Sequence, residues 1–336
     1  MCQNHLESRS MKSGSDCKIC ITIFSGGVGG AKLARGFASA FQDQDIRIVV
    51  NTADDEVFYG LYVCPDIDTM IYHLSGIFNP DQGWGVRDET FITLNQLSIL
   101  GENVWFKLGD RDLATHLLRT RMLQEGANLT EVTHHLCQKL GITAEILPMS
   151  NDPVRTFISS GKTELPFQEY FVKHRCQVNV DAVQFKGIEL AKPTQKVIDA
   201  IHNADLIVFA PSNPVVSILP ILNLKGLREK IRSSVACKLA VSPLIGCKAL
   251  RGPAADLMPV LSHDASAAGV ADFYQGLVDH LFIHLNDANM KKKIENHGLR
   301  AVPSNIIMPE MSDSIRLAKE IFKYFKRISG AGGENA

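Results

Sequence analysis

Five acidic side chains fall within 15 residues that contain no Lys or Arg: Asp54, Asp55, Glu56, Asp66 and Asp68. Carboxylates this close in sequence repel one another unless a cation lies between them. Mg²⁺ is commonly held by one or two carboxylates together with substrate phosphates. We therefore predict a Mg²⁺ site here, with Asp54, Asp66 and Asp68 as ligands. For Asp68 alone, capping of the helix that follows it is an equal alternative.

A glycine-rich turn, Ser25 to Lys32, directly follows an apolar run. Glycines at this place free backbone N–H groups to face an anion at a helix N-terminus. We take Gly26, Gly27 and Gly29 as candidate phosphate contacts. The turn is neither a P-loop nor a complete dinucleotide fingerprint, because Lys32 stands at the third glycine. Asn51 replaces the acid that would bind a ribose, so a nicotinamide cofactor is disfavoured. A tight turn without a ligand is the alternative.

Three other places carry polar groups suited to binding. Trp84 lies between two glycines and could support an aromatic ring or simply anchor its loop. Arg111 could bind a phosphate through two hydrogen bonds or pair with neighbouring acids. Ser212 and Asn213 follow the strongest apolar run of the chain and could hold a base or a sugar, although ordinary turn chemistry also explains them.

Strands and helices alternate around these residues. Ile19–Phe24, a helix over Ala31–Phe41 and Ile46–Val50 form a predicted βαβ unit. The runs Ala204–Ala210 and Lys238–Val241 add strands that are apolar throughout, as expected where both faces of a sheet are buried. The pattern predicts an α/β protein: a Rossmann-like, doubly wound, mostly parallel sheet with a smaller α+β insertion domain.

The predicted core comprises residues 19–112 and 191–329, and the insertion comprises residues 113–190. Residues 1–18 and 330–336 are predicted to be tails. The insertion should contain helices over Asp112–Gln124 and Leu129–Leu140, followed by a hairpin of Phe167–Val172 with Val178–Phe185. The first helix should bury an apolar stripe made of Ala114, Leu117, Leu118 and Met122.

Charge and hydropathy exclude several classes of protein. The 336 residues hold 35 Lys+Arg and 36 Asp+Glu, so no basic face for nucleic acid is expected. No apolar run is long enough to span a membrane, and no apolar leader opens the chain. Eight irregularly spaced cysteines without such a leader indicate a cytoplasmic location.

Nine motifs give the chain a family resemblance over residues 19 to 325. They are SGGVGGAKL (25–33), NTADD (51–55), PDIDT (65–69), WG-x-R (84–87), LGDRDLATHL (108–117), LPMSNDPVRT (147–156), FQEYFV (167–172), APSNPVVSI (210–218) and SPLIG (242–246). In this order they resemble the 2-phospho-L-lactate transferase family of coenzyme F-420 biosynthesis. Ile67 and Asn151 depart from residues usual in that family.

The resemblance implies Mg²⁺-dependent transfer of a phosphoryl-bearing three-carbon acid from a guanosine diphosphate conjugate. The acceptor would be the ribityl hydroxyl of 7,8-didemethyl-8-hydroxy-5-deazariboflavin, and GMP would be released. The enzyme would be a homodimer. Asp55, with Asp54, would be catalytic, and Asp55 would contact the ribityl chain and act as general base. Gly26, Gly27 and Gly29 would bind the diphosphate.

For the two ends of the substrates, the resemblance implies separate loops. Ser212 and Asn213 would hold the guanosine, whereas Trp84, Arg87 and the residues to Thr93 would frame the deazaflavin. A related family of sugar-nucleotide-binding gluconeogenesis factors shares the glycine and acid loops. A regulator without catalysis is therefore the alternative function.

Overall fold

The computed structural model describes residues 18–249 and 252–330. Its centre is a seven-stranded sheet in the order β14-β13-β10-β9-β1-β2-β5, in which every neighbouring pair is parallel. The strands are β1 (Cys20–Ser25), β2 (Asp45–Val50), β5 (Glu145–Pro148), β9 (Leu206–Phe209), β10 (Cys237–Val241), β13 (His280–His284) and β14 (Arg300–Ser304). The Rossmann-like, doubly wound prediction is confirmed.

The strand order reverses between β1 and β9, which pair side by side although about 180 residues separate them. Chain segments leaving these two strands turn to opposite sides, so a crevice is expected outside their carboxyl ends. The glycine turn follows β1, and Ser212 and Asn213 follow β9 shortly after its end. The fold therefore brings two of the predicted binding loops to one place.

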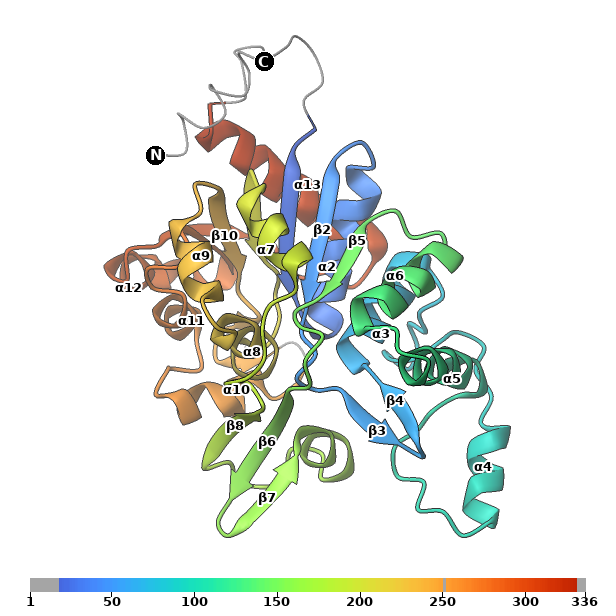
Figure 1. Ribbon diagram of the computed structural model, residues 1–336. Helices are drawn as coiled ribbons and strands as arrows, with labels where there is room; N and C mark the ends of the chain where they lie inside the picture. The colour runs from blue at the N-terminus through green and yellow to red at the C-terminus, as the bar shows by residue number, and fades with distance from the viewer. Residues whose placement is uncertain (1–17, 250–251, 331–336) are drawn as a thin grey trace.

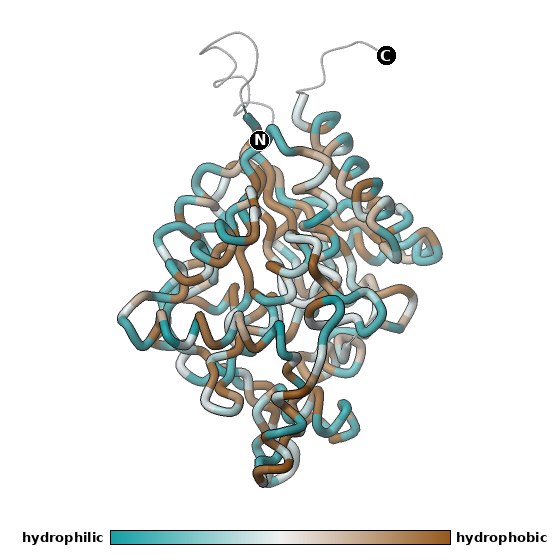
Figure 2. The backbone as a smooth tube through the Cα atoms, turned by 90° about the vertical axis from the view of Figure 1, so that its right-hand side faces the viewer, coloured by the Kyte–Doolittle hydropathy of each residue, from teal (hydrophilic) through white to brown (hydrophobic). Residues whose placement is uncertain are grey.

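Helices cover both faces of the sheet (Figure 1). One face is covered by α2 (Gly27–Ala40), α3 (Pro65–Ser75), α6 (Leu129–Lys139) and α13 (Met311–Ile328). The other is covered by α7 (Gln195–His202), α8 (Leu219–Asn223), α9 (Leu227–Ser233), α10 (Ala254–Leu257), α11 (Ala267–Phe273) and α12 (Lys291–Asn296). Ile21 and Ile23 of β1 pack on the first layer and Phe24 on the second. Burial on both faces explains the continuous apolar strands, which run brown through the middle of Figure 2.

Smaller elements lie below the main sheet in Figure 1. They are the antiparallel sheet β7-β6-β8, with β6 (Arg155–Ser160), β7 (Thr163–Pro166) and β8 (Ala182–Lys186), and the hairpin of β3 (Glu56–Phe58) with β4 (Leu61–Val63). The described residues also include α4 (Ile92–Ile99), α5 (Asp110–Gln124), β11 (Leu244–Ile245) with β12 (Lys248–Ala249), two π-helical turns (Glu169–Lys173 and Pro214–Ile218), and two 3-10 turns (Met258–Leu261 and Leu285–Met290).

Two predictions about the insertion were wrong. Residues 113–190 do not form one insertion, because β5 within them pairs with β2 in the main sheet. The predicted strand Phe167–Val172 is largely a π-helical turn over Glu169–Lys173, and β7 ends before it at Pro166. Phe167 and Tyr170 are both buried, a spacing of three that suits a helical turn.

The buried face of α5 also differs from the prediction. Leu117 is 58% exposed, whereas Asp112, Leu113, His116 and Arg119 are buried. Helix α5 therefore turns mainly polar side chains inward. The reason is a network of ion pairs and hydrogen bonds described below.

No helix among the described residues is both long and apolar enough to cross a membrane. The two predicted tails lie outside the described residues, apart from Lys18 and Gly330.

Candidate active site

The glycine turn forms the first turn of α2, which begins at Gly27 and not at Ala31 as predicted. The Gly27 N–H donates to Asp66 Oδ1 at 2.7 Å, and the Gly26 N–H donates to Ser212 Oγ at 3.0 Å. A Cβ at Gly29 would lie 2.5 Å from the Pro211 carbonyl oxygen. The turn therefore touches both the acid loop (residues 54–68) and the loop after β9, and an added Cβ would clash at Gly26 and at Gly29.

Asn51, at the end of β2, organises the acid loop. Its side-chain N–H₂ donates to Asp66 Oδ2 at 2.9 Å, and its Oδ1 accepts from the Ala53 N–H at 3.0 Å. The sequence predicts only that Asn51 does not bind a ribose as an acid at this position would. Its amide instead links the loop after β2 to the start of α3.

Asp54 and Asp55 are buried with unsatisfied oxygens. Asp54 is 6% and Asp55 1% exposed, and within residues 18–249 and 252–330 no hydrogen-bond partner reaches Asp54 Oδ1 or either Asp55 oxygen. Burial raises the pKa of Asp55 to about 8, and this rise is opposed by the charge of Arg155, then by the nearby Cys64 thiol and by the charge of Arg119. Burial, followed by the charge of Asp66, raises the pKa of Asp54 well above its usual value. Burial also raises the pKa of Asp66, to about 6. Such carboxylates are suited to a proton or a cation.

The predicted Mg²⁺ fits Asp54 and Asp55 better than the predicted set. Their orphaned oxygens are hard ligands of the kind that Mg²⁺ takes, and a cation would offset the cost of ionising them where they are buried. Both Asp66 oxygens already accept hydrogen bonds, from Gly27 and Asn51. In the described part of the chain, no cluster of three or more His, Cys, Asp or Glu could hold a metal. Substrate phosphates would therefore have to complete the coordination.

Asp68 does not fit the predicted role as a metal ligand. Both its oxygens contact the Arg119 guanidinium, and Oδ2 also accepts from the Cys64 N–H at 3.2 Å. It does not cap α3 either, because that helix begins at Pro65 with Cys64 in the N-cap position. The lone pairs of Asp68 are used inside the protein, so its negative charge is already compensated.

The loop after β9 is held by its own turn. Asn213 Oδ1 accepts from the Val215 N–H at 2.9 Å, which caps the turn Pro214–Ile218. The Asn213 side-chain nitrogen is buried, and the described residues offer it no hydrogen-bond partner. Ser212 is also buried, with its Oγ on the Gly26 amide. The predicted guanosine contacts thus flank the glycine turn.

The predicted deazaflavin residues form a second group around α4 and the start of α5. The Trp84 ring lies 6.3 Å from that of Phe91, and Trp84 is 38% exposed. The Arg111 side chain donates to the Arg87 carbonyl at 3.2 Å, and the Thr93 N–H donates to Asp110 at 3.0 Å. Arg111 therefore helps to order this loop through a backbone contact, which is neither the phosphate contact nor the pairing with neighbouring acids expected from the sequence.

Sequence reasoning missed residues from two elements. In β6, the Thr156 N–H donates to the Ala53 carbonyl at 2.7 Å, which ties the small sheet to the acid loop. Arg155 beside it donates to Tyr62 Oη at 3.1 Å, and its charge lowers the pKa of Asp55. The second element is α5, from which Arg119 was missed. Arg155 lies within the motif LPMSNDPVRT, and Arg119 lies two residues beyond LGDRDLATHL, so the motifs themselves were the available signal.

The raised pKa of Asp55 predicts how stability depends on pH. Because folded Asp55 holds its proton up to about pH 8 and the unfolded group only to 3.8, the native state binds more protons in between. This contribution to the free energy of unfolding is full below about pH 4 and is lost as pH rises to about 8. In buffers with a chelator, we expect the Tm of Asp55→Asn to gain on that of the parent steadily between these values. A constant Tm difference would contradict the raised pKa.

Together, the fold and the site define the class of protein to which the chain belongs. A parallel doubly wound sheet with a glycine turn and buried carboxylates at its switch point is typical of α/β proteins that bind phosphorylated ligands. The family model for 2-phospho-L-lactate transferase CofD matches residues 21–327. The chain belongs to this family and is a transferase.

Curated relatives agree with this assignment. The chain is 39% identical over 314 residues to a phosphoenolpyruvate transferase of Streptomyces griseus, covering 92% of this chain and 99% of the relative. It is 40% identical over 259 residues to a 2-phospho-L-lactate transferase of Methanospirillum hungatei, covering 77% of this chain and 86% of the relative. These names favour the enzyme over a regulator without catalysis.

The fold is shared more widely. A crystal structure of a UPF0052 family member from Bacillus halodurans superimposes with a TM-score of 0.63 at 19% identity, covering 92% of this chain and 100% of that one. At this identity the likeness concerns the fold alone.

Proposed function

We propose that the protein transfers a phospho-lactyl or phosphoenolpyruvyl-type group from a guanosine diphosphate conjugate to 7,8-didemethyl-8-hydroxy-5-deazariboflavin in coenzyme F-420 biosynthesis. The observation that carries this proposal is the hydrogen bond from the glycine turn to Asp66, whose charge acts on the buried Asp54 next to Asp55, close to the sheet's switch point. The names of the relatives support either three-carbon acid. The protein would act as a cytoplasmic homodimer.

In the reaction, the ribityl hydroxyl oxygen forms a bond to the phosphorus that bears the three-carbon acid. The bond from this phosphorus to the GMP oxygen breaks, and GMP leaves. Displacement at a diphosphate depends mainly on positioning and charge neutralisation. The Gly26 and Gly27 amides already donate to Ser212 and Asp66, but the first turn of α2 holds no acidic residue of its own, which favours an anionic ligand at the amides that follow.

Asp55 is our candidate for the general base that receives the proton of the ribityl hydroxyl. Its pKa of about 8 lies near the pH of the cell, where a base is most effective. Asp54 would hold Mg²⁺, which when bound neutralises charge on the diphosphate, and this leaves Asp55 to take the proton. Ser212 and Asn213 would hold the guanosine, and Trp84, Arg87 and Thr93 the deazaflavin.

The test is to supply purified protein with Mg²⁺, the deazaflavin and both donors, lactyl and enolpyruvyl guanosine diphosphate, in separate and competing reactions. We expect one GMP per product molecule with at least one donor, and turnover lost on adding EDTA. Mass spectrometry of the product identifies which acid was transferred. Absence of product with either donor, together with binding of a sugar nucleotide, would overturn the proposal in favour of a regulator.

A further inference from the structure

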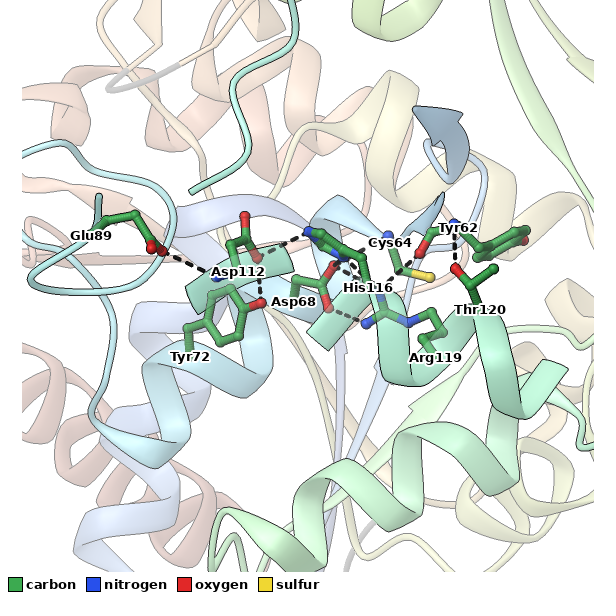
Figure 3. A network of polar contacts seen from close by, with 9 residues as sticks. All are labelled: Tyr62, Cys64, Asp68, Tyr72, Glu89, Asp112, His116, Arg119 and Thr120. Carbon is green, nitrogen blue, oxygen red and sulfur yellow. Dashed lines mark hydrogen bonds and ion pairs between the residues drawn. The ribbon is translucent and has the colours of Figure 1, made fainter. Parts of the chain in front are cut away.

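The inward face of α5 carries a fully buried cation. Arg119 is 0% exposed, and its guanidinium contacts both oxygens of Asp68 (Figure 3). One of its nitrogens also lies 3.3 Å from the Tyr62 carbonyl oxygen and 3.2 Å from His116 Nδ1. This set of residues connects α5 with α3 and with the strand before it.

These contacts fix the segment that leads into the acid cluster. Beside Arg119, Thr120 Oγ1 accepts from the Tyr62 N–H at 2.8 Å, so α5 holds both backbone groups of Tyr62. Asp68 in turn accepts from the Cys64 N–H. Together they set where α3 begins, and the first turn of α3 carries Asp66, which holds the Gly27 amide.

The network continues toward the loop before α4. His116 Nε2 lies 3.0 Å from Asp112 Oδ1, which also accepts from Tyr72 Oη. The Asp112 N–H donates at 3.2 Å to Glu89, a residue of the loop that carries Trp84 and Arg87. Figure 3 shows these side chains in one row between Glu89 and Tyr62. Helix α5 therefore joins the acid loop, which carries Asp66, to the loop proposed to bind the acceptor, which carries Trp84 and Arg87.

Stability alone does not account for such a pair. Burying two charges costs several kcal/mol for each ion, and well-packed apolar residues of similar volume often stabilise a protein as well or better. What the ion pair supplies in addition is a fixed geometry, because a guanidinium with two bonds to a carboxylate allows little rotation.

We propose that Arg119, with Asp68, is a positioning residue for the transfer: the pair fixes the first turn of α3 and thereby places the buried carboxylates against the glycine turn. This inference rests on the proposed function. It predicts a lower kcat, because displacing the carboxylates slows the chemical step more than it weakens binding of the donor.

The test replaces both charges at once, in Arg119→Met/Asp68→Leu, so that neither remains buried alone. We expect a Tm within about 3 °C of the parent, kcat lowered at least tenfold, and the donor KM within threefold. The matched control is Arg47→Met/Asp45→Leu, which removes an ion pair of 2.7 Å. This pair lies at the amino-terminal end of β2, away from the site at the carboxyl end. The control variant should keep the parent kcat.

A folded double variant with kcat within threefold of the parent would overturn the inference. If the double variant does not fold, Arg119→Lys decides. A lysine keeps a positive charge beside Asp68 but cannot also reach Tyr62 and His116. We therefore expect kcat to fall at least threefold with the donor KM unchanged. A kcat equal to that of the parent would again overturn the inference. Failure of the parent protein itself to turn over would instead refute the proposed function, and the inference with it.

Discussion

Replacing Asp55 by Asn is expected to lower kcat by about 10²–10⁴-fold, the usual contribution of a general base. The change keeps the shape of the side chain but removes the group that would take the hydroxyl proton. Steady-state turnover with saturating donor, acceptor and Mg²⁺ measures the effect directly.

The matched control is Asp205→Asn. Asp205 is also buried, at 6% exposure, and it accepts from the Cys20 N–H at 2.9 Å. This contact lies at the amino-terminal ends of β1 and β9, opposite to the site. An Asn there can still accept that bond, so kcat should stay within twofold. If Asp55→Asn retained turnover within about threefold of the parent, a change worth less than 1 kcal/mol of barrier, the role given to Asp55 would be wrong.

Gly29→Ala is expected to weaken donor binding by at least tenfold. The added Cβ would lie 2.5 Å from the backbone oxygen of Pro211, which cannot rotate away as a side chain could. Helix α2 and the loop after β9 would have to separate, and with them the proposed sites for the diphosphate and the guanosine. Isothermal titration with GDP and Mg²⁺ measures the change in Kd.

Gly36→Ala is the control, because it produces a comparable clash in the same helix away from the site. Its Cβ would meet the Ser314 backbone at the contact of α2 with α13. We expect it to lower Tm while the folded protein keeps the parent Kd for GDP. Equal Kd values for Gly29→Ala and the parent would show that the turn does not bind the donor.

The core of the fold could be predicted from the sequence because its signals are local. Continuous apolar strands and a glycine turn between β1 and α2 are readable within some 30 residues. The face of α5 was misread because its buried residues are charged: hydropathy places Arg119 and His116 outside, and only their long-range partners keep them in. The spacing of Asp112, His116 and Arg119, four and then three residues, was the helical signal available.

The candidate site was predicted as a set of loops but not as a set of contacts. The sequence places Asp54, Asp66 and Asp68 in neighbouring segments, yet their burial and partners differ. Asp68 is neutralised by Arg119, 51 positions away, whereas Asp55 keeps its oxygens unpartnered among the described residues. The link from Arg155 to Tyr62 spans 93 positions. Pairings at such separations depend on the tertiary fold, and no local pattern encodes them.

The most direct test of the account is a crystal structure of the protein with Mg²⁺ and an unreactive guanosine diphosphate donor. The account predicts the diphosphate within hydrogen-bond distance of the amides at Gly26 to Gly29, with the metal between it and Asp54 or Asp55. A diphosphate bound away from both the glycine turn and these carboxylates would contradict it.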